Sequence, residues 1–198
     1  MKRTLALATL VVLLLPVALA AKDSRDSRDS GNSLVRFEGG IGVDPVSNVA
    51  GDPVILVING VNTTTFPNVI RNVVRGVNPP GQIWRIAALT ADVKIDGRIR
   101  VQGRGLLLAG GNTIGTNGNQ SVRARLFCDN TTTPTRFDSA NLVALEPNGD
   151  FRIDDVLRAT NGPTPGATPP NPCASPVLLI INGGGAWFAA GIPDLDND

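Results

Sequence analysis

One stretch, from Gln82 to Gly111, most constrains what this chain can fold into. It reads QIWRIAALTADVKIDGRIRVQGRGLLLAGG, and within it the segment ADVKI at 91–95 alternates apolar and polar residues. A period of two is typical of a β-strand with one face on a core and one face in solvent. Asp96-Gly97 then predicts a hairpin, because that dipeptide suits tight turns between antiparallel strands.

The register of this hairpin decides which side chains reach the core, since a slip of one residue exchanges the two faces. A two-residue loop would place Ile95 beside Arg98 and mix apolar with charged residues. A three-residue loop pairs Ile95 with Ile99 and Val93 with Val101, and it keeps the apolar residues together. We therefore expect the three-residue loop, although glycine is more usual at its third position. The face turned to solvent then carries Lys94 and Arg100.

The rest of the chain repeats the same pattern of short apolar runs separated by turn residues, and it contains no convincing amphipathic helix. Ser121 to Asp129 alternates cleanly, with Arg123 and Arg125 on the face opposite the apolar residues. Many short strands with frequent glycine turns predict an all-β fold. We expect an antiparallel β-sandwich with one disulfide, and a barrel-like variant is the alternative.

A second hairpin is predicted at Glu146-Pro147-Asn148-Gly149-Asp150. Pro147 and Asn148 suit a type I turn, and Gly149 suits the left-handed position that follows it. This loop would pair Leu145 with Phe151 and Val143 with Ile153.

The N-terminus has the pattern of a secretory signal peptide over residues 1–20. Lys2 and Arg3 precede an apolar run, and Ala18-Leu19-Ala20 supplies the small residues of a cleavage site. An uncleaved anchor is the lesser reading. Residues 21–33 are polar and repetitive and predict a disordered linker, residues 34–193 a single domain, and residues 194–198 an acidic tail. We expect a periplasmic or extracellular protein with no transmembrane anchor after cleavage.

The two cysteines, Cys128 and Cys173, are expected to pair, because an exported protein meets an oxidising compartment. Two buried free thiols are the alternative.

The chain contains no histidine and no tyrosine, and Met1 is its single methionine. These absences exclude a Ser-His-Asp triad, a Cys-His pair and the usual imidazole metal ligands. No metal, cofactor or catalytic residue is assigned, and a binding or structural role is favoured over a catalytic one.

Basic residues dominate from Arg71 to Arg125, and acidic residues dominate from Leu126 onward. Such asymmetry is typical of a polyanion-binding face, although the two halves would also neutralise each other if they paired across one sheet. An anionic envelope polymer or polysaccharide would be the ligand of such a face, and an ordinary solvated face that resists edge aggregation is the alternative. Nucleic acid is not expected, because Trp84 is the only plausible stacking partner in the region and the compartment argues against it. The candidate face consists of Lys94, Arg98, Arg100 and Arg104.

Trp84 and Trp187 would stack on sugar rings if exposed, although both lie beside apolar strand residues and packing in the core is the stronger reading. Without histidine, the enzyme class that survives is a glycoside hydrolase with two carboxylates. Glu38, Glu146, Asp154 and Asp155 are available, but nothing in the sequence brings any two of them together. The spacing of Asp194, Asp196 and Asp198 resembles part of a calcium loop but lacks its glycine and its final glutamate.

The segments GGIGV, PPGQIW, DGRIRVQGRGLLLAGG, EPNGDFRIDDVL, CASPVLLI and WFAAGIP resemble those of a small family of uncharacterised exported bacterial proteins. This resemblance covers most of the chain after the linker. It implies an exported bacterial origin and brings no activity, ligand or catalytic residue. The sequence therefore predicts a binding or structural role at the cell envelope or outside the cell, with a glycoside hydrolase or a carbohydrate-binding module as the alternative.

Overall fold

The computed structural model describes residues 32–50, 54–65 and 68–194. The expected signal peptide, nearly all of the expected linker and residues 195–198 of the expected acidic tail lie outside these ranges. Ser33 already belongs to the first strand, so the folded region begins slightly before the predicted boundary at Leu34. Residues 32–194 belong to one compact unit.

Secondary structure in the described ranges is almost entirely β, as the short apolar runs predict. None of these residues forms a helix with the length and apolarity needed to span a lipid bilayer. The strands are β1 (Ser33–Gly42), β2 (Val46–Ala50), β3 (Val54–Ile58), β4 (Val61–Thr65), β5 (Asn68–Arg71), β6 (Trp84–Arg85), β7 (Ala88–Lys94), β8 (Arg98–Arg104), β9 (Leu107–Leu108), β10 (Ser121–Phe127), β11 (Phe137–Asp138), β12 (Val143–Ala144), β13 (Phe151–Val156), β14 (Arg158–Ala159), β15 (Val177–Asn182) and β16 (Trp187–Pro193).

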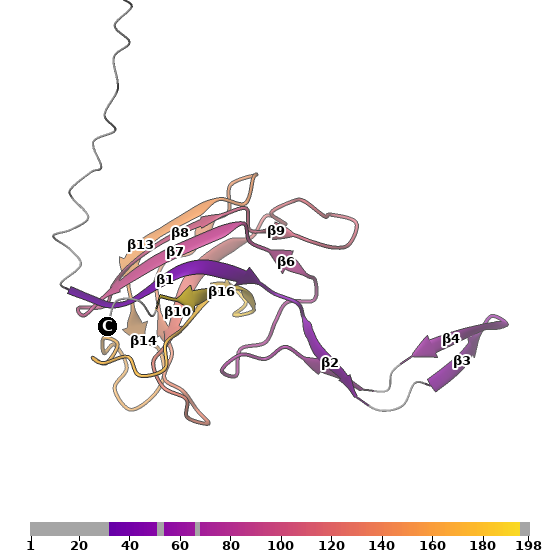
Figure 1. Cartoon of the computed structure of the whole chain (residues 1–198), viewed down its shortest axis with the longest axis horizontal. Coiled ribbons are helices and arrows are strands. Elements are labelled where there is room, and N and C mark those ends of the chain that lie inside the picture. The colour runs from indigo at the N-terminus through magenta and orange to yellow at the C-terminus, as the bar shows by residue number, and fades with distance from the viewer. Residues whose placement is uncertain (1–31, 51–53, 66–67, 195–198) are drawn as a thin grey trace, which may run out of the picture. The chain divides into compact units, whose positions relative to one another are not determined.

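The main sheet contains ten strands, all paired antiparallel, in the order β13-β8-β7-β1-β16-β15-β10-β11-β14, with β12 also paired to β10. The sheet curls, so that β12 comes to lie against β13 from the opposite edge. Figure 1 shows β13, β8, β7 and β1 side by side, with β16 and β10 continuing the curve. The all-β antiparallel prediction is confirmed, and the single, nearly closed sheet corresponds to its barrel-like form.

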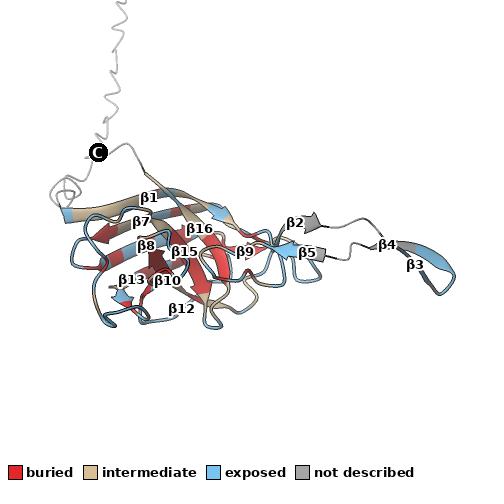
Figure 2. Ribbon diagram, turned by 90° about the horizontal axis from the view of Figure 1, so that it is seen from below, coloured by how far each residue is buried: buried red, intermediate tan, exposed pale blue. Residues whose placement is uncertain are grey.

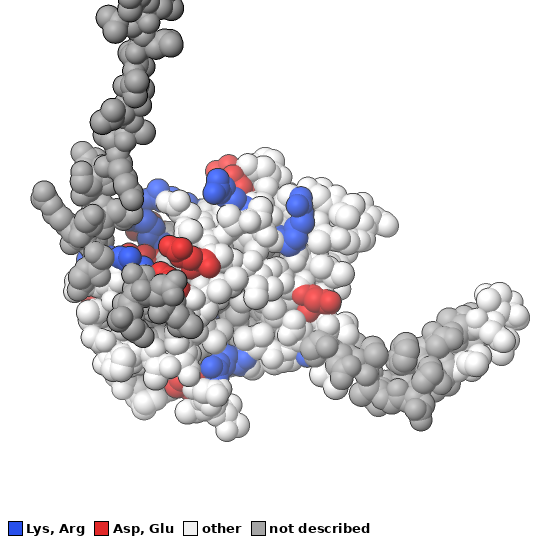
Figure 3. Space-filling model, in the orientation of Figure 1, with Lys and Arg blue, Asp and Glu red and all other residues white. Residues whose placement is uncertain are grey.

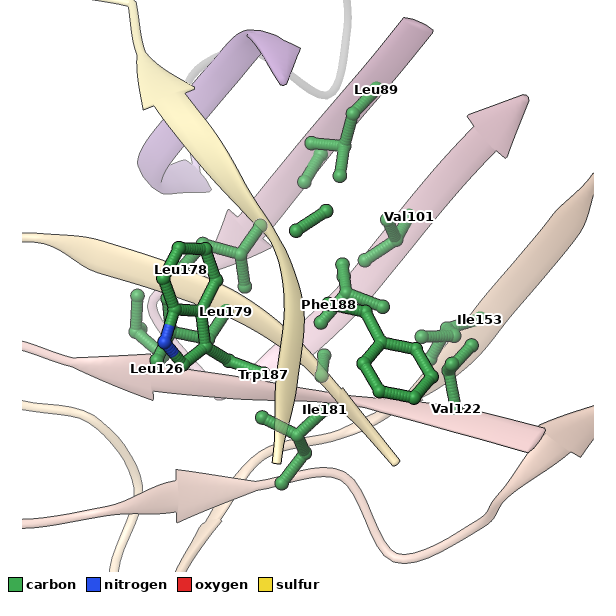
Figure 4. Close-up of a cluster of buried hydrophobic side chains, with 14 of the residues drawn as sticks. Leu89, Val101, Val122, Leu126, Ile153, Leu178, Leu179, Ile181, Trp187 and Phe188 are labelled. Atoms are coloured by element: carbon green, nitrogen blue, oxygen red, sulfur yellow. The ribbon is translucent and has the colours of Figure 1, made fainter. Parts of the chain in front are cut away.

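The interior of this sheet holds the apolar residues that alternate along its strands. Along β8, buried and exposed residues alternate strictly, and Ile99 and Val101 point inward. Phe188 joins them from β16, and Figure 4 shows its ring near Val101, Val122 and Ile153. Figure 2 shows the buried residues concentrated along the middle strands of the curled sheet.

A second apolar layer covers part of the outside of the sheet. All four residues from Leu178 to Ile181 are completely buried, and successive strand side chains point to opposite faces, so both faces of β15 are covered. Trp187 contributes to the outer layer, whereas Phe188 lies on the other side of the β16 ribbon (Figure 4). The segment 72–79 is fixed over this layer, because the Trp187 indole N–H donates to the carbonyl of Asn72 at 2.9 Å.

The hairpin between β7 and β8 has a three-residue loop, but the predicted register is wrong. The structure pairs Val93 with Ile99 and Ala91 with Val101, and the loop is Ile95-Asp96-Gly97. Gly97 has φ +87° and its N–H donates to the Lys94 carbonyl at 2.9 Å. Glycine therefore takes the left-handed third position of the loop, where an L side chain would be strained. Ile95 consequently lies in the turn and is exposed.

The predicted turn at 146–150 is confirmed. The N–H of Gly149 donates to the Glu146 carbonyl at 2.8 Å, the N–H of Glu146 donates to the Asp150 carbonyl at 2.9 Å, and φ of Gly149 is +82°. The expected ladder beyond it is not formed by the described strands, because β12 pairs with β10 and β13 pairs with β8. The turn therefore connects β12 and β13, which lie at opposite edges of the sheet and approach each other.

The predicted disulfide is present between Cys128 and Cys173. Cys128 directly follows β10 and Cys173 precedes β15, and these two strands are neighbours in the sheet. The bond therefore links the segment that leaves β10 to the segment that enters the neighbouring strand β15.

Three two-stranded sheets complete the described structure, formed by β2–β5, β3–β4 and β6–β9. The β3–β4 hairpin turns at Asn59-Gly60, both with positive φ, which is the geometry that favours this dipeptide. Ile55, Val57 and Val61 of this hairpin are exposed.

Candidate functional site

The predicted basic face is built differently from the expectation, beginning with Lys94. This residue was expected to face solvent, but it is 5% exposed. Its Nζ lies 2.8 Å from an Asp92 carboxylate oxygen and donates to Ser33 Oγ at 3.2 Å. The reason is that β7 is an inner strand, with β1 beside it as well as β8, so Lys94 lies opposite Ser33.

Arg100, another basic residue of this face, lies among carboxylates. Arg36, Asp92, Arg100 and Asp154 occupy one row across β1, β7, β8 and β13, so charges of alternating sign are neighbours. Arg100 approaches Asp154 at 3.5 Å. Blue and red atoms adjoin on the face seen in Figure 3. The basic and acidic halves of the chain therefore meet across one sheet, and we call this row the charge ladder.

Of the two ends of β8, only the end at Arg98 places a basic residue beside a carboxylate. Arg98 pairs with Asp96 at 2.8 Å, and hydrogen bonds from Arg98, chiefly from its backbone N–H, hold the pKa of Asp96 below its ordinary value. Arg104 at the other end is exposed and lies opposite Ala88. The four predicted residues thus do not form one cationic surface.

Neither tryptophan offers a ring face to a ligand. Trp84 is 5% exposed and stacks on Phe188 with ring centroids 4.2 Å apart, and Trp187 is 3% exposed. The stacking hypothesis for these two residues is therefore wrong, and the core-packing alternative describes both.

The four carboxylates considered for glycoside hydrolysis are dispersed. Asp154 and Asp155 are consecutive strand residues and so point to opposite faces of β13. Asp155 accepts hydrogen bonds from the backbone and side chain of Asn141; burial opposes its ionisation, but these bonds and that from the Val156 N–H outweigh burial and lower its pKa. Glu146 belongs to a turn and Glu38 to β1.

Metal-binding groups of three or more His, Cys, Asp or Glu side chains are not found within the described ranges. Asp194 is described, whereas Asp196 and Asp198 of the acidic tail lie outside those ranges.

A buried ion pair that the sequence did not reveal lies on the outer face of β10. Arg125 donates through Nε and Nη2 to the two oxygens of Asp138, at 2.6 Å each. The Arg125 and Asp138 side chains are only 10% and 5% exposed. Bidentate geometry with two charged partners is the strongest form of such a hydrogen bond, and it fixes the guanidinium plane. Nη1 of Arg125 takes no part in the pair.

Arg125 lines a cavity of about 450 Å³, which we call the arginine pocket. Arg71 and Arg136 line the same cavity, so three basic residues from distant parts of the chain meet there. None of its lining residues, all within the described ranges, is acidic. The remaining lining residues are Gly76, Val77, Asn78, Pro79, Gly184, Gly185 and Ala186.

The walls of the arginine pocket are held by hydrogen bonds that do not involve a ligand. Arg71 Nη2 donates to the Pro79 carbonyl at 2.8 Å, and the Trp187 N–H donates to the Asn78 carbonyl at 3.0 Å. The backbone of Arg136 is held by Asn161 and Thr160. These hydrogen bonds within the protein hold the pocket walls in place, which lowers the entropy lost on binding.

Sequence reasoning missed this site. Arg71 and Arg125 mark the two ends of the basic region noted in the sequence, but the spacing gives no sign that they converge with Arg136. A comparison with known proteins finds no matching family model, and no significant match to a curated protein or a solved structure. The arrangement of residues alone therefore supports the function proposed next.

Proposed function

We propose that this protein is an exported, non-catalytic binding protein whose arginine pocket takes an anionic group of an envelope polymer or polysaccharide. The observation that carries the proposal is the convergence of Arg71, Arg125 and Arg136 on one cavity without an acidic lining residue. Asp138 neutralises one of the three positive charges, that of Arg125.

The chemistry of the guanidinium group favours this class of ligand. Its planar set of donors matches the two oxygens of a carboxylate, sulfate or phosphate, and it remains charged at every ordinary pH. Arg125 is already oriented by Asp138, so it need not be ordered again when a ligand binds. A volume of about 450 Å³ is within the range of pockets that hold small ligands or single polymer units.

Export is supported by the signal-peptide pattern at residues 1–20, by the resemblance to exported bacterial proteins and by the disulfide. The Cys128–Cys173 bond is compatible with a compartment outside the cytoplasm, where such bonds persist. Envelope polymers that carry carboxylate or phosphate groups are the anionic partners of that compartment.

Binding of trigalacturonate and of a short polyphosphate, measured by calorimetry at low salt, tests the proposal. The first probe supplies carboxylates and the second supplies phosphates, so the pair also identifies the anionic group. We expect at least one of them to bind, and the affinity to fall as salt rises, because the attraction is electrostatic.

Arg136→Gln is the informative variant, because Arg136 is an exposed residue that lines the pocket. Removing one charge-assisted contact is expected to weaken binding about tenfold or more. Arg104→Gln, which makes the same change at the end of β8, is the matched control and should bind like the unmodified protein. Equal affinity of both variants, or no binding of either probe, would refute the proposal.

A further inference from the structure

A second cavity, of about 760 Å³, lies beside Trp84 and differs in chemistry from the arginine pocket. It is formed by the β6–β9 pair and by the loop of residues 113–120, with Pro147 at its edge. Its lining residues are all described, and none of them is charged. We call it the amide pocket, because Gln82, Asn117, Asn119 and Gln120 contribute side-chain amides to it.

We infer that the amide pocket binds a neutral saccharide. A sugar presents hydroxyl groups that both donate and accept hydrogen bonds, together with apolar C–H surfaces. The pocket supplies both kinds of contact, with amide and hydroxyl groups such as those of Gln82, Asn119 and Thr113 and an apolar wall at Leu108 and Trp84. An uncharged lining of this kind favours neutral polar ligands, since it offers an ion no opposite charge to offset its loss of hydration.

The polar residues of the pocket divide into those that shape the loop and those that remain for a ligand. Asn117 Nδ2 donates to the carbonyls of Leu145 and Glu146, both at 3.0 Å, and Gln120 Nε2 donates to the Gly118 carbonyl at 3.1 Å. Within the described ranges, the exposed side-chain amides of Gln82 and Asn119 make no hydrogen bond to the protein. These two amides are the groups we assign to saccharide recognition.

Hydrogen bonds within the protein also hold the loop of this pocket in place. The backbone N–H groups of Leu108 and Gly115 donate to the carbonyls of Thr116 and Leu108, both at 2.9 Å, and attach the loop to β9. At the base of the loop, Gln120 Oε1 accepts a hydrogen bond from Asn182. Because the loop is ordered before binding, little further entropy is lost there when a ligand binds.

Trp84 packs in the core, as the sequence favoured, and also borders this pocket. Its indole stacks on Phe188, and its six-membered ring lies beside Gly118, where an added Cβ would be 3.4 Å from Cη2. The ring therefore provides the wall of the cavity and no open stacking platform. A Cβ at Gly118 would contact this ring, so glycine lets the loop pass close to the wall.

The test is a titration of ¹⁵N-labelled protein with cellotriose, chitotriose and maltotriose, followed by amide chemical shifts. We expect at least one of these neutral sugars to shift the resonances of residues 113–120 and of the Trp84 indole N–H. The doubly substituted protein Gln82→Ala/Asn119→Gly should bind that sugar at least about tenfold more weakly, as expected for the loss of two hydrogen bonds. Glycine is chosen at Asn119 because φ there is +51°.

Gln102→Ala is the matched control, because Gln102 is an exposed glutamine on β8, outside the lining of the cavity. It should leave the sugar affinity unchanged. Arg136→Gln should also leave it unchanged, so this inference and the proposed anion binding can fail independently. The inference is overturned if none of the three sugars shifts these resonances, or if the double substitution leaves binding intact.

Discussion

Replacing Asp138 by asparagine should destabilise the protein strongly, because Arg125 would remain buried without its carboxylate. Both hydrogen bonds of this pair are 2.6 Å long, and the two side chains are 10% and 5% exposed. Removing one partner of such a buried pair typically lowers the free energy of unfolding by about 3–5 kcal/mol. Asparagine keeps the shape of aspartate, so the change tests charge more than packing.

The matched control is Asp154→Asn, which breaks the pair between Arg100 and Asp154 in the charge ladder and the similar exposed pair between Arg152 and Asp154. Arg100 and Asp154 approach each other at 3.5 Å, and their side chains are 59% and 60% exposed. An exposed ion pair contributes only about 0–1 kcal/mol, because water and salt screen it. The two substitutions are chemically identical, and the expected difference in stability between them arises from burial.

Urea unfolding with the disulfide intact, followed by tryptophan fluorescence, measures the difference. With a slope of about 2 kcal/mol per molar urea, a loss of about 4 kcal/mol lowers the midpoint by about 2 M. Asp154→Asn should move the midpoint by less than about 0.5 M. Similar midpoints for the two variants would refute the argument.

A further variant separates an unpaired charge from a lost contact. Arg125→Met combined with Asp138→Leu removes both charges, and replacing a whole buried pair by apolar residues is often neutral. We expect this protein to be more stable than Asp138→Asn. If it is less stable, the pair itself is the source of the stability, and the unpaired charge is not the main cause of the loss.

Three further predictions follow from the packing, the ionisation and the disulfide of the fold. Gly103→Ala should lower the free energy of unfolding by about 1–3 kcal/mol in thermal unfolding, because the added Cβ would overlap the Phe151 ring. Adding Phe151→Leu to this variant should restore part of the loss, and additive destabilisation by the two substitutions would contradict this. Asp155 has a lowered pKa, so its contribution is present at neutral pH and is lost as the pH falls below about 4; Asp155→Asn should therefore lower the melting temperature at pH 7 and flatten its fall in acid, whereas an unchanged slope would exclude this role. Replacing Cys128 and Cys173 by serine should lower the free energy of unfolding by about 4 kcal/mol, because the closed loop spans 45 residues, and an unaltered melting temperature would rule this out.

Local patterns were sufficient to predict much of the fold. Alternation placed Val93, Ile99 and Val101 in the core, and the turn at 146–150 follows from its proline and glycine. The register error at Asp96-Gly97 had a usable signal, because glycine at the third loop position favours the observed pairing. The hydrophobic alternation outweighed that signal in the prediction, although Ile95 is the one apolar residue of the pattern that belongs to the turn.

The candidate sites could not be predicted in the same way, because alternation shows only that two residues share a face. It does not show whether a distant segment covers that face. Arg125 was correctly placed opposite the core residues of β10, yet the partner that buries its charge, Asp138, comes from β11. The arginine pocket likewise needs segments near residues 71, 125 and 136 to meet, and no local pattern specifies such a meeting.

The Cys128–Cys173 bond has a consequence for how this protein responds to proteolysis. The bond closes residues 128–173 into a covalent ring that includes strands β11 to β14 and an exposed stretch at 162–166. A protease that cuts this stretch would open the ring without releasing a fragment, since both new ends remain joined through the cysteines. The nicked protein should therefore keep its apparent mass under oxidising conditions and separate into two pieces only after reduction and unfolding.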